Sequence, residues 1–428
     1  MPLVKPPSSI LIIMLLCIAT CGCVNDSNSE SDNLVTIWAY DSSAEVAEKA
    51  VEIYKRNHPD CPYEFEVVSL GQEDMVEKIK IYLTIGSIDT LPNIFYDEDY
   101  NFMEYISYHQ EYFVDLTPHI SADDYYQYKL INVIYDDKVY AIPYDCGTGT
   151  LFYRVDLIEK AGYSEADMTE LTWDEYIHIG QKVKSATGVD LLVIIPEGDM
   201  EGRLLYQSAG TWFFDEEGNA NIANNPGFVS AITTLKRVFD SDIVYKASSW
   251  DDMISCIGNE KIVSLVGGSW WAPIISSFED QSGLWRVAEM PKMTGSDSYS
   301  SYSNLGGGNW FIINKENQNF ATEFAVEMFG NNIELANYAA EKYYVIPVNK
   351  KLVEGLTDSG TEFFGGQKVV TFMSETNQHI KPVKYGLHTY EITYTVGGYV
   401  GDYVNGYLSL DAAIAKMQTA AEKVVSSS

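Results

Sequence analysis

The stretch NLVTIWAY at residues 33–40 and the segments after it, as far as NIFYD at residues 93–97, decide the fold. The first stretch alternates in polarity and is rich in β-branched and aromatic residues, which is typical of a strand. Apolar residues then recur with a helical period over residues 46–54, and Pro59 ends that helix. The next expected elements are a strand at residues 63–68, a helix at residues 73–85 and a strand at residues 93–97.

This order of strand and helix predicts an α/β lobe with a mainly parallel sheet. Ligands of such sheets bind beyond the carboxyl ends of the strands. Tyr40 and Asp41 lie at the end of the first predicted strand, and Tyr96 and Asp97 at the end of the third. These four residues are therefore candidate ligand contacts by position.

The chain is too long for a single core. It has 428 residues, whereas one hydrophobic core stops growing at roughly 250 to 300 residues. A second block begins near Tyr144 and includes a helix that Thr172 is expected to cap. A last helix is expected over residues 409–425. Two lobes are therefore predicted, each a sheet flanked by helices.

The charge of the chain argues against nucleic acid as a partner. The formal net charge is −33, and such a surface repels phosphate backbones and anionic lipid headgroups. The six histidines never fall into a zinc-ligand spacing. Cys61, Cys146 and Cys256 permit one disulfide at most. Neither a metal nor a cofactor is expected.

The N-terminus reads as an export signal. Residues 10–23 are ILIIMLLCIATCGC, preceded by Lys5 and followed by the polar stretch VNDSNSESDN. The apolar run has the length of a signal peptide and is too short for a membrane-spanning helix. The small residues before Cys23 resemble a bacterial lipoprotein box, which predicts lipidation of Cys23. Cys21 remains an alternative, as does a plain secretory signal.

Eight segments, in their order along the chain, resemble the extracellular solute-binding proteins of bacterial carbohydrate ABC transporters, the family that includes maltose-binding protein. They are VTIWAY (35–40), LPNIFYD (91–97), FVDLTPHI (113–120), KVYAIPYDCGTGTLFYRVDLIEKAGY (138–163), TWDEY (172–176), QSAGTWFFDEEGN (207–219), IVSLVGGSWW (262–271) and NLGGGNWFIIN (304–314). The resemblance implies two α/β lobes of the periplasmic-binding-protein type II fold, joined by a hinge, with the ligand in the cleft between them.

The resemblance also implies how the chain is divided. The signal peptide would cover residues 1–22 and a flexible tether residues 23–33. The N-terminal lobe would comprise residues 34–143 plus 288–346, and the C-terminal lobe residues 144–287 plus 347–428. Crossings between the lobes are expected near residues 142–145, 286–291 and 346–349.

A sugar needs flat aromatic surfaces and a few fixed hydrogen-bond partners. Trp270 stands where the family commonly places a stacking tryptophan and is the first candidate. Its neighbour Trp271 is the second, and it could instead pack in the core. Trp212 stands where the family often lines the second lobe's wall.

Carboxylates and glycines complete the expected site. Asp97 could bind a sugar hydroxyl or simply cap the next helix, and Asp145 could face the cleft at the hinge or serve a turn. The glycines before Asn309 resemble a family segment in which backbone amides approach the ligand. The remaining candidates are Gly307, Asn309 and Trp310, with Tyr144, Tyr343 and Tyr344 as weaker ones.

These features predict a non-catalytic, lipid-anchored receptor on the extracellular face of the cell membrane. It would act as a monomer, bind a mono- or oligosaccharide and deliver it to the permease subunits of an ABC transporter. No catalytic motif is complete, since Phe152 replaces the third glycine of a dinucleotide fingerprint. A secreted glycoside hydrolase or lyase remains an alternative, as does a receptor for a peptide, a polyamine or a polyol phosphate.

Overall fold

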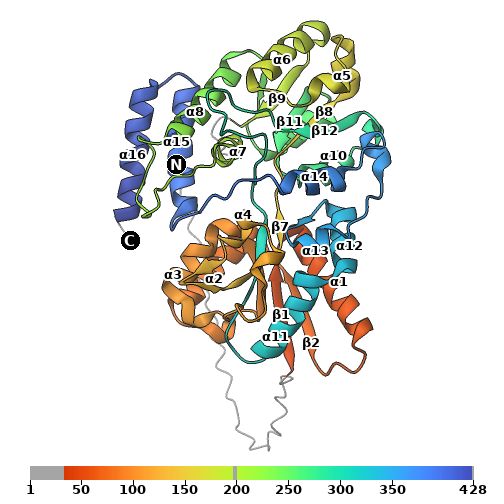
Figure 1. Ribbon diagram of the computed structural model, residues 1–428, viewed down its shortest axis with the longest axis vertical. Coiled ribbons are helices and arrows are strands. Elements are labelled where there is room, and N and C mark those ends of the chain that lie inside the picture. The colour runs from red at the N-terminus through yellow and green to blue at the C-terminus, as the bar shows by residue number, and fades with distance from the viewer. Residues whose placement is uncertain (1–32, 196–199, 427–428) are drawn as a thin grey trace, which may run out of the picture. The chain divides into compact units, whose positions relative to one another are not determined.

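The computed structural model describes residues 33–195 and 200–426 (Figure 1). The lipidation expected at Cys23, the alternative Cys21 and the signal peptide lie outside these residues. Within the described residues no helix is long and apolar enough to span a membrane.

The first sheet has the strand order β2-β1-β3-β13-β6. Its first three strands form the expected β-α-β-α-β unit, in which β1 pairs in parallel with β2 and β3. Strand β13 joins from a distant part of the sequence and pairs antiparallel with β3 and β6. The strands are β1 (Leu34–Ala39), β2 (Glu64–Ser69), β3 (Ile94–Glu98), β6 (Ala141–Pro143) and β13 (Gly308–Ile312).

The second sheet has the order β10-β9-β11-β8-β12. Strands β10, β9 and β11 are parallel, whereas β8 pairs antiparallel with β11 and β12. In each sheet four of the five strands therefore run in one direction, and a single strand, β13 in the first sheet and β8 in the second, runs against them. The predicted mainly parallel sheets are confirmed. The strands are β8 (Thr150–Arg154), β9 (Asp190–Ile194), β10 (Val244–Lys246), β11 (Ile262–Gly267) and β12 (Trp285–Glu289).

Helices flank both sheets, as the alternating sequence predicts (Figure 1). Thr172 caps α6 as expected, because its hydroxyl accepts the Glu175 N–H while the Glu175 carboxylate accepts the Thr172 N–H. The helices around the first sheet are α1 (Asp41–Asn57), α2 (Gln72–Thr84), α3 (Phe102–His109), α4 (Gln127–Leu130), α11 (Gln318–Ala325), α12 (Ile333–Tyr343) and α13 (Lys350–Val353). Those around the second are α5 (Val155–Lys160), α6 (Trp173–Thr187), α7 (Met200–Ala209), α8 (Pro226–Asp240), α9 (Trp250–Gly258), α10 (Trp271–Ser276), α14 (Val369–Asn377), α15 (Thr389–Val404) and α16 (Leu410–Ser426).

Short elements complete the chain. A two-stranded ribbon pairs β7 with β14 and links segments far apart in the sequence. A second ribbon pairs β4 with β5. The short elements are β4 (Ile134–Tyr135), β5 (Lys138–Val139), β7 (Asp145–Cys146), β14 (Ile346–Pro347), the π-helical turn η7 (Val326–Gly330) and the 3-10 turns η1 (Ile88–Thr90), η2 (Asp99–Asn101), η3 (Gln110–Tyr112), η4 (Ala122–Asp124), η5 (Glu165–Met168), η6 (Glu279–Gln281) and η8 (Thr361–Phe364).

The first sheet packs in one apolar core, and the buried residues of the second sheet divide between two others. Strand β13 is buried along its whole length, which suits its place between β3 and β6. After β12, Met290, Met293, Tyr299 and Leu305 still belong to the core of the second sheet. The chain reaches the first sheet only with β13, which begins at Gly308.

Candidate functional site

A cavity of about 590 Å³ lies where the carboxyl ends of strands from both sheets meet the β7 segment. It receives side chains from both lobes, as expected for a ligand between two α/β units. The lining residues used below are Tyr40, Asp41, Gln72, Tyr96, Glu98, Tyr144, Asp145, Arg203, Trp250, Ser269, Trp270, Gly306, Gly307, Tyr343 and Tyr344.

The first sheet supplies two tyrosines from adjacent strands. Tyr40 follows β1 and Tyr96 lies in β3, and because these strands are parallel neighbours their rings meet edge to face with centroids 5.3 Å apart. Both tyrosines and Asp41 line the cavity, which is where the strand-end argument predicted them. Asp41 is exposed and opens α1.

The β7 segment supplies Tyr144 and Asp145, which also line the cavity. Asp145 Oδ1 accepts hydrogen bonds from the Tyr96 hydroxyl at 2.9 Å and from the Gly308 N–H at 2.6 Å. Burial raises the pKa of the Asp145 carboxyl, while Lys129 and these hydrogen bonds act to lower it. Asp145 thus ties β3 and β13 to the segment between the lobes.

Gly307 allows the chain to pass very close to Asp145. Its φ is +79°, and a Cβ there would lie 2.5 Å from the Asp145 carbonyl oxygen. Only glycine fits both the conformation and the contact. Gly307 therefore lines the cavity with backbone alone, and the approach of this glycine run to a ligand stays a prediction.

The second sheet supplies an aromatic wall. Trp270 follows β11, and its ring packs at 5.5 Å from that of Trp250 with an interplanar angle of 46°. Its indole N–H points to the Leu305 carbonyl oxygen at 3.4 Å. Both tryptophans line the cavity, together with Tyr343 and Tyr344 from the end of α12.

Glu98 and Arg203 both line the cavity, and neither was predicted from the sequence. Burial raises the pKa of Glu98 to about 7, and the nearby Arg203 guanidinium opposes that rise. The hydroxyl of Tyr390, on α15, donates a hydrogen bond to the Glu98 carboxyl group. The cavity therefore offers a carboxyl group and a guanidinium close to each other.

Strand alternation explains why Glu98 lines the cavity and Asp97 does not. Successive side chains of a strand point to opposite faces, so Tyr96 and Glu98 share one face of β3. Asp97 is fully buried, and its Oδ2 accepts hydrogen bonds from Asn101 at 2.9 Å and Tyr105 at 2.6 Å. It anchors the turn after β3 and lies outside the cavity lining, contrary to its predicted contact with ligand.

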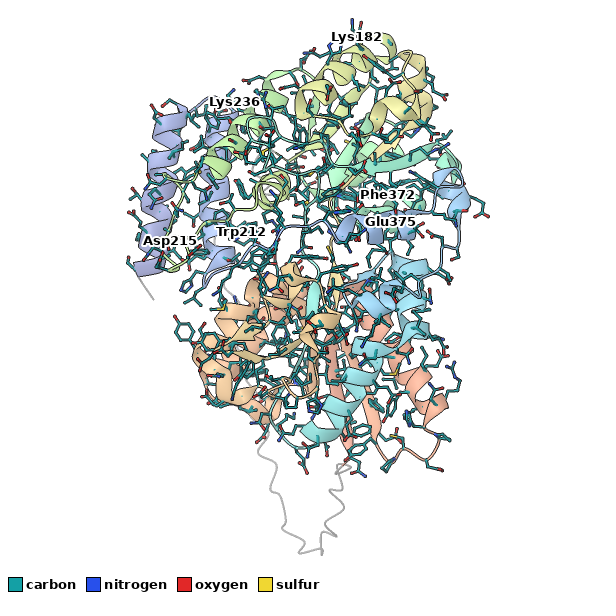
Figure 2. All side chains as sticks on the ribbon, viewed as in Figure 1. Lys182, Trp212, Asp215, Lys236, Phe372 and Glu375 are labelled. Atoms are coloured by element: carbon teal, nitrogen blue, oxygen red, sulfur yellow. The ribbon has the colours of Figure 1, made fainter. Side chains whose placement is uncertain are left out.

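Two predicted tryptophan contacts lie in apolar cores instead of the cavity lining. Trp271 is fully buried in an apolar core at the start of α10, although the centre of its ring lies only 5.1 Å from that of Trp270. Trp212, labelled in Figure 2, is 2% exposed and stacks on Tyr100 with ring centroids 5.6 Å apart. At both positions, closeness in sequence to a binding motif could not distinguish a tryptophan that packs in the core from one that contacts a ligand.

Two residues of β13 are also outside the cavity lining. Asn309 is fully buried and donates through Nδ2 to Asp99 Oδ1 at 2.7 Å. Trp310 is fully buried and stacks on Phe329 with ring centroids 3.8 Å apart. Both support the strand from within the first lobe, because β13 is covered on both faces.

Some of the lining residues that were not predicted could have been found from a pattern in the sequence, and others could not. Glu98 could have been found from the alternation of β3. Arg203 and Trp250 follow β9 and β10, and because no strands were predicted there, their carboxyl ends offered no candidates. Gln72 and Ser269 are ordinary polar residues that only the fold brings to the cavity.

The arrangement suits a polar ligand with apolar faces. Aromatic rings can stack on such faces, while carboxyl groups and the guanidinium can bind hydroxyls. Among residues 33–195 and 200–426 no group of three or more His, Cys, Asp or Glu side chains could hold a metal ion. The three cysteines of the described part are free thiols, namely Cys61, Cys146 and Cys256.

Comparison with known proteins shows the family to which the chain belongs. The family model described as "Bacterial extracellular solute-binding protein" matches residues 49–362. The lactose-binding protein of Rhizobium radiobacter is 30% identical over 369 residues, which cover 84% of this chain and 85% of that protein.

Solved structures share the fold at lower identity. The sugar-binding protein MalE of Xanthomonas citri has a TM-score of 0.76 at 16% identity, covering 92% of this chain and 98% of that one. The galacto-N-biose-/lacto-N-biose I-binding protein of Bifidobacterium longum has a TM-score of 0.74 at 18% identity, covering 92% and 97% respectively. With the fold, the cavity between the sheets and the matched segment in agreement, the chain belongs to the bacterial extracellular solute-binding protein family.

Proposed function

We propose that the protein is a receptor that binds a mono- or oligosaccharide and delivers it to the permease of an ABC transporter. The observation that carries this proposal is the cavity itself, where Trp270 and Trp250 face Asp41, Glu98 and Arg203. Such a lining combines stacking surfaces with hydroxyl-binding groups. The similarity to a lactose-binding protein over most of the chain supports the same ligand class.

The proposed mechanism is closure of two lobes around the ligand. A ligand that contacts both sheets makes more contacts in the closed state than in the open state, and therefore favours closure. A permease can then distinguish the closed, loaded receptor from the open, empty one. The ligand contacts proposed are Tyr40, Asp41, Tyr96, Tyr144, Asp145, Trp270 and Gly307, together with Glu98, Arg203 and Trp250.

We place the hinge at three crossings. They are the step from β6 to β8, the step from Leu305 to β13, and β14. We propose the second crossing later in the chain than residues 286–291, and the packing of Met290, Met293, Tyr299 and Leu305 in a core of the second sheet supports this.

The proposed anchor is a lipid on Cys23. The ten residues that follow Cys23, residues 24–33, can reach at most roughly 30 to 36 Å when extended. A lipid there would hold the monomeric receptor close to its permease at the extracellular face of the membrane. Mass spectrometry of the membrane-extracted protein tests this, since an unmodified N-terminus would contradict it.

Isothermal titration against a panel of saccharides tests the ligand class. The panel contains lactose, maltose, arabino-oligosaccharides and an acidic glycan, each titrated into wild type and Trp270→Ala. We expect at least one neutral saccharide to bind wild type, and the variant to bind it much more weakly. No heat from any saccharide would contradict the proposal.

The same samples test the absence of catalysis. Because a receptor releases its ligand unchanged, chromatography after prolonged incubation should recover the bound saccharide intact. Accumulating shorter products would favour a hydrolase or a lyase instead.

A further inference from the structure

Tyr100 belongs to the first lobe by sequence but is seated in the core of the second. It lies in η2, directly after β3, and is only 1% exposed. Its ring stacks on Trp212 at 5.6 Å and 11°, and it meets the ring edges of Tyr385 at 4.6 Å and Tyr390 at 5.6 Å. These partners belong to the second sheet's side of the molecule, so Tyr100 bridges the lobes.

This aromatic cluster backs one side of the ligand cavity. Arg203 lines the cavity, and its guanidinium carbon lies 5.3 Å from the centre of the Tyr100 ring. Glu98 also lines the cavity and accepts the Tyr390 hydroxyl. The N–H of Gly306, a third lining residue, points to the Tyr100 hydroxyl at 3.4 Å. We call these residues, Glu98, Tyr100, Arg203, Gly306 and Tyr390, the Tyr100 wall.

The exposed part of the cavity lining lies away from this wall. Trp250 is 38% exposed and packs on Trp271 of α10 with ring centroids 4.6 Å apart. Asp41 is the other exposed lining residue and opens α1. In Figure 1, α10 and α12 lie on the opposite side of the sheets from α7 and α15, which carry Arg203 and Tyr390. Of the lining residues that the structure describes, those of the wall are buried or half-buried, and the exposed ones are Asp41 and Trp250.

We propose that the Tyr100 wall is a length stop that makes the site take the end of a short saccharide. The terminal unit lies against Glu98 and Arg203, where the carboxyl group accepts from one hydroxyl and the guanidinium donates to its neighbour. Further units extend only towards Asp41 and Trp250. This inference rests on the proposed saccharide receptor and adds that the site selects by chain length and by which end of the chain enters.

The wall is a specificity device because no ligand can pass it while the lobes remain joined there. Displacing Tyr100 would expose an aromatic ring that is now buried among three others, and would separate Tyr390 from Glu98. A ligand with a bulky group on its inward end can bind only if Tyr100 is displaced, and the free energy of that displacement lowers its affinity. A ligand with the same group on its outward end leaves Tyr100 in place.

Isothermal titration with a series of one linkage, from disaccharide to tetrasaccharide, tests the proposal. Each saccharide is also used in two substituted forms. One carries a bulky aglycone at the reducing end, and the other carries a bulky substituent on the non-reducing end. For wild type we expect a substituent on one end to abolish binding and the same substituent on the other end to be tolerated. Equal tolerance of substituents on both ends would overturn the length stop.

Variants in the wall provide the second arm. Tyr390→Ala removes the ring and the hydroxyl that hold Glu98, so it should improve the affinity for the inward-substituted ligand by about tenfold relative to the unsubstituted one. Tyr390→Phe keeps the ring and should keep the stop while weakening the contact with Glu98. Tyr407→Ala is the control, because Tyr407 is 78% exposed and lies outside both the cavity lining and the wall.

The outcomes separate this inference from the proposed function. If wild type binds no saccharide of any length, the receptor assignment fails. If wild type binds the short saccharides but Tyr390→Ala leaves the relative affinities unchanged, or if Tyr407→Ala changes them equally, only the length stop is overturned.

Discussion

Asp97 and Glu98 are neighbours in β3 whose carboxyl groups lie in different surroundings. Glu98 lines the cavity, while Asp97 is held inside the first lobe by Asn101 and Tyr105. Burial raises the pKa of both groups, that of Asp97 to about 6 and that of Glu98 to about 7. The two carboxyl groups therefore give separate and testable pH dependences.

Asp97 should make the fold less stable as the pH rises. Its pKa in the folded protein is about 6, above its ordinary value of 3.8, so between these values the folded state binds the proton and the unfolded chain does not. The free energy of unfolding then falls with rising pH, by up to about 3 kcal/mol from this group. Asp97→Asn should flatten this part of the profile in urea unfolding between pH 4 and pH 7, whereas the exposed Asp280→Asn should not. A variant profile parallel to that of wild type would contradict this role.

Trp270 should contribute strongly to ligand affinity. Trp270→Ala removes a stacking surface from the cavity and should weaken saccharide binding by about tenfold or more. The matched control is Tyr407→Ala, since Tyr407 is 78% exposed and outside the cavity lining. Titration of both variants with the same saccharide measures this difference in affinity. Equal affinities for the two variants would show that Trp270 does not contact the ligand.

At the scale of elements, the buried ion pair between α4 and η2 holds the turn after β3. Lys129 Nζ lies 2.6 Å from Asp99 Oδ1, with both side chains fully buried. Lys129→Met leaves a buried carboxylate without its cation and should destabilise the protein by about 3 to 5 kcal/mol. Lys351→Met breaks a pair with Asp124 at a lysine that is 68% exposed, and should cost less than about 1 kcal/mol. Similar losses of unfolding free energy would contradict this view of the turn.

Two glycines test the close approach of β13 to the β7 segment. Gly307 and Gly218 both have positive φ, +79° and +84°, but only at Gly307 would a Cβ meet backbone atoms. Gly218→Ala should cost roughly 1 to 2 kcal/mol for the conformation alone. Gly307→Ala should cost about 1 to 3 kcal/mol more because of the added clash. Thermal unfolding of both variants measures the difference, and equal losses would mean that the contact relaxes easily.

The elements that could be predicted from sequence are those with clear periodicity. The unit from β1 to β3 and the capped helix α6 follow local patterns that the sequence displays directly. Strands β9 and β10 were not predicted, and the pairing of β13 with β3 could not be derived from periodicity, because that pairing joins residues about two hundred positions apart. The family resemblance placed Trp270 first and left Trp271 open between a ligand contact and the core, because the burial of Trp271 depends on how α10 packs.

At the scale of the whole molecule, a ligand between the lobes should stabilise both together. A ligand at a hundredfold excess over its Kd adds about 2.7 kcal/mol to the free energy of unfolding. Thermal unfolding with increasing saccharide should therefore raise the Tm of wild type, and leave that of Trp270→Ala nearly unchanged at the same concentration. A rise in Tm of the same size in both would place the ligand elsewhere.

The account depends on one claim, that a saccharide binds in the cavity between the two sheets. A crystal structure of the protein with the saccharide that binds most tightly in titration tests that claim most directly. We predict a sugar ring stacked on Trp270, with its terminal unit against Glu98 and Arg203. A saccharide bound at another surface, with Trp270 free of contact, would contradict the account.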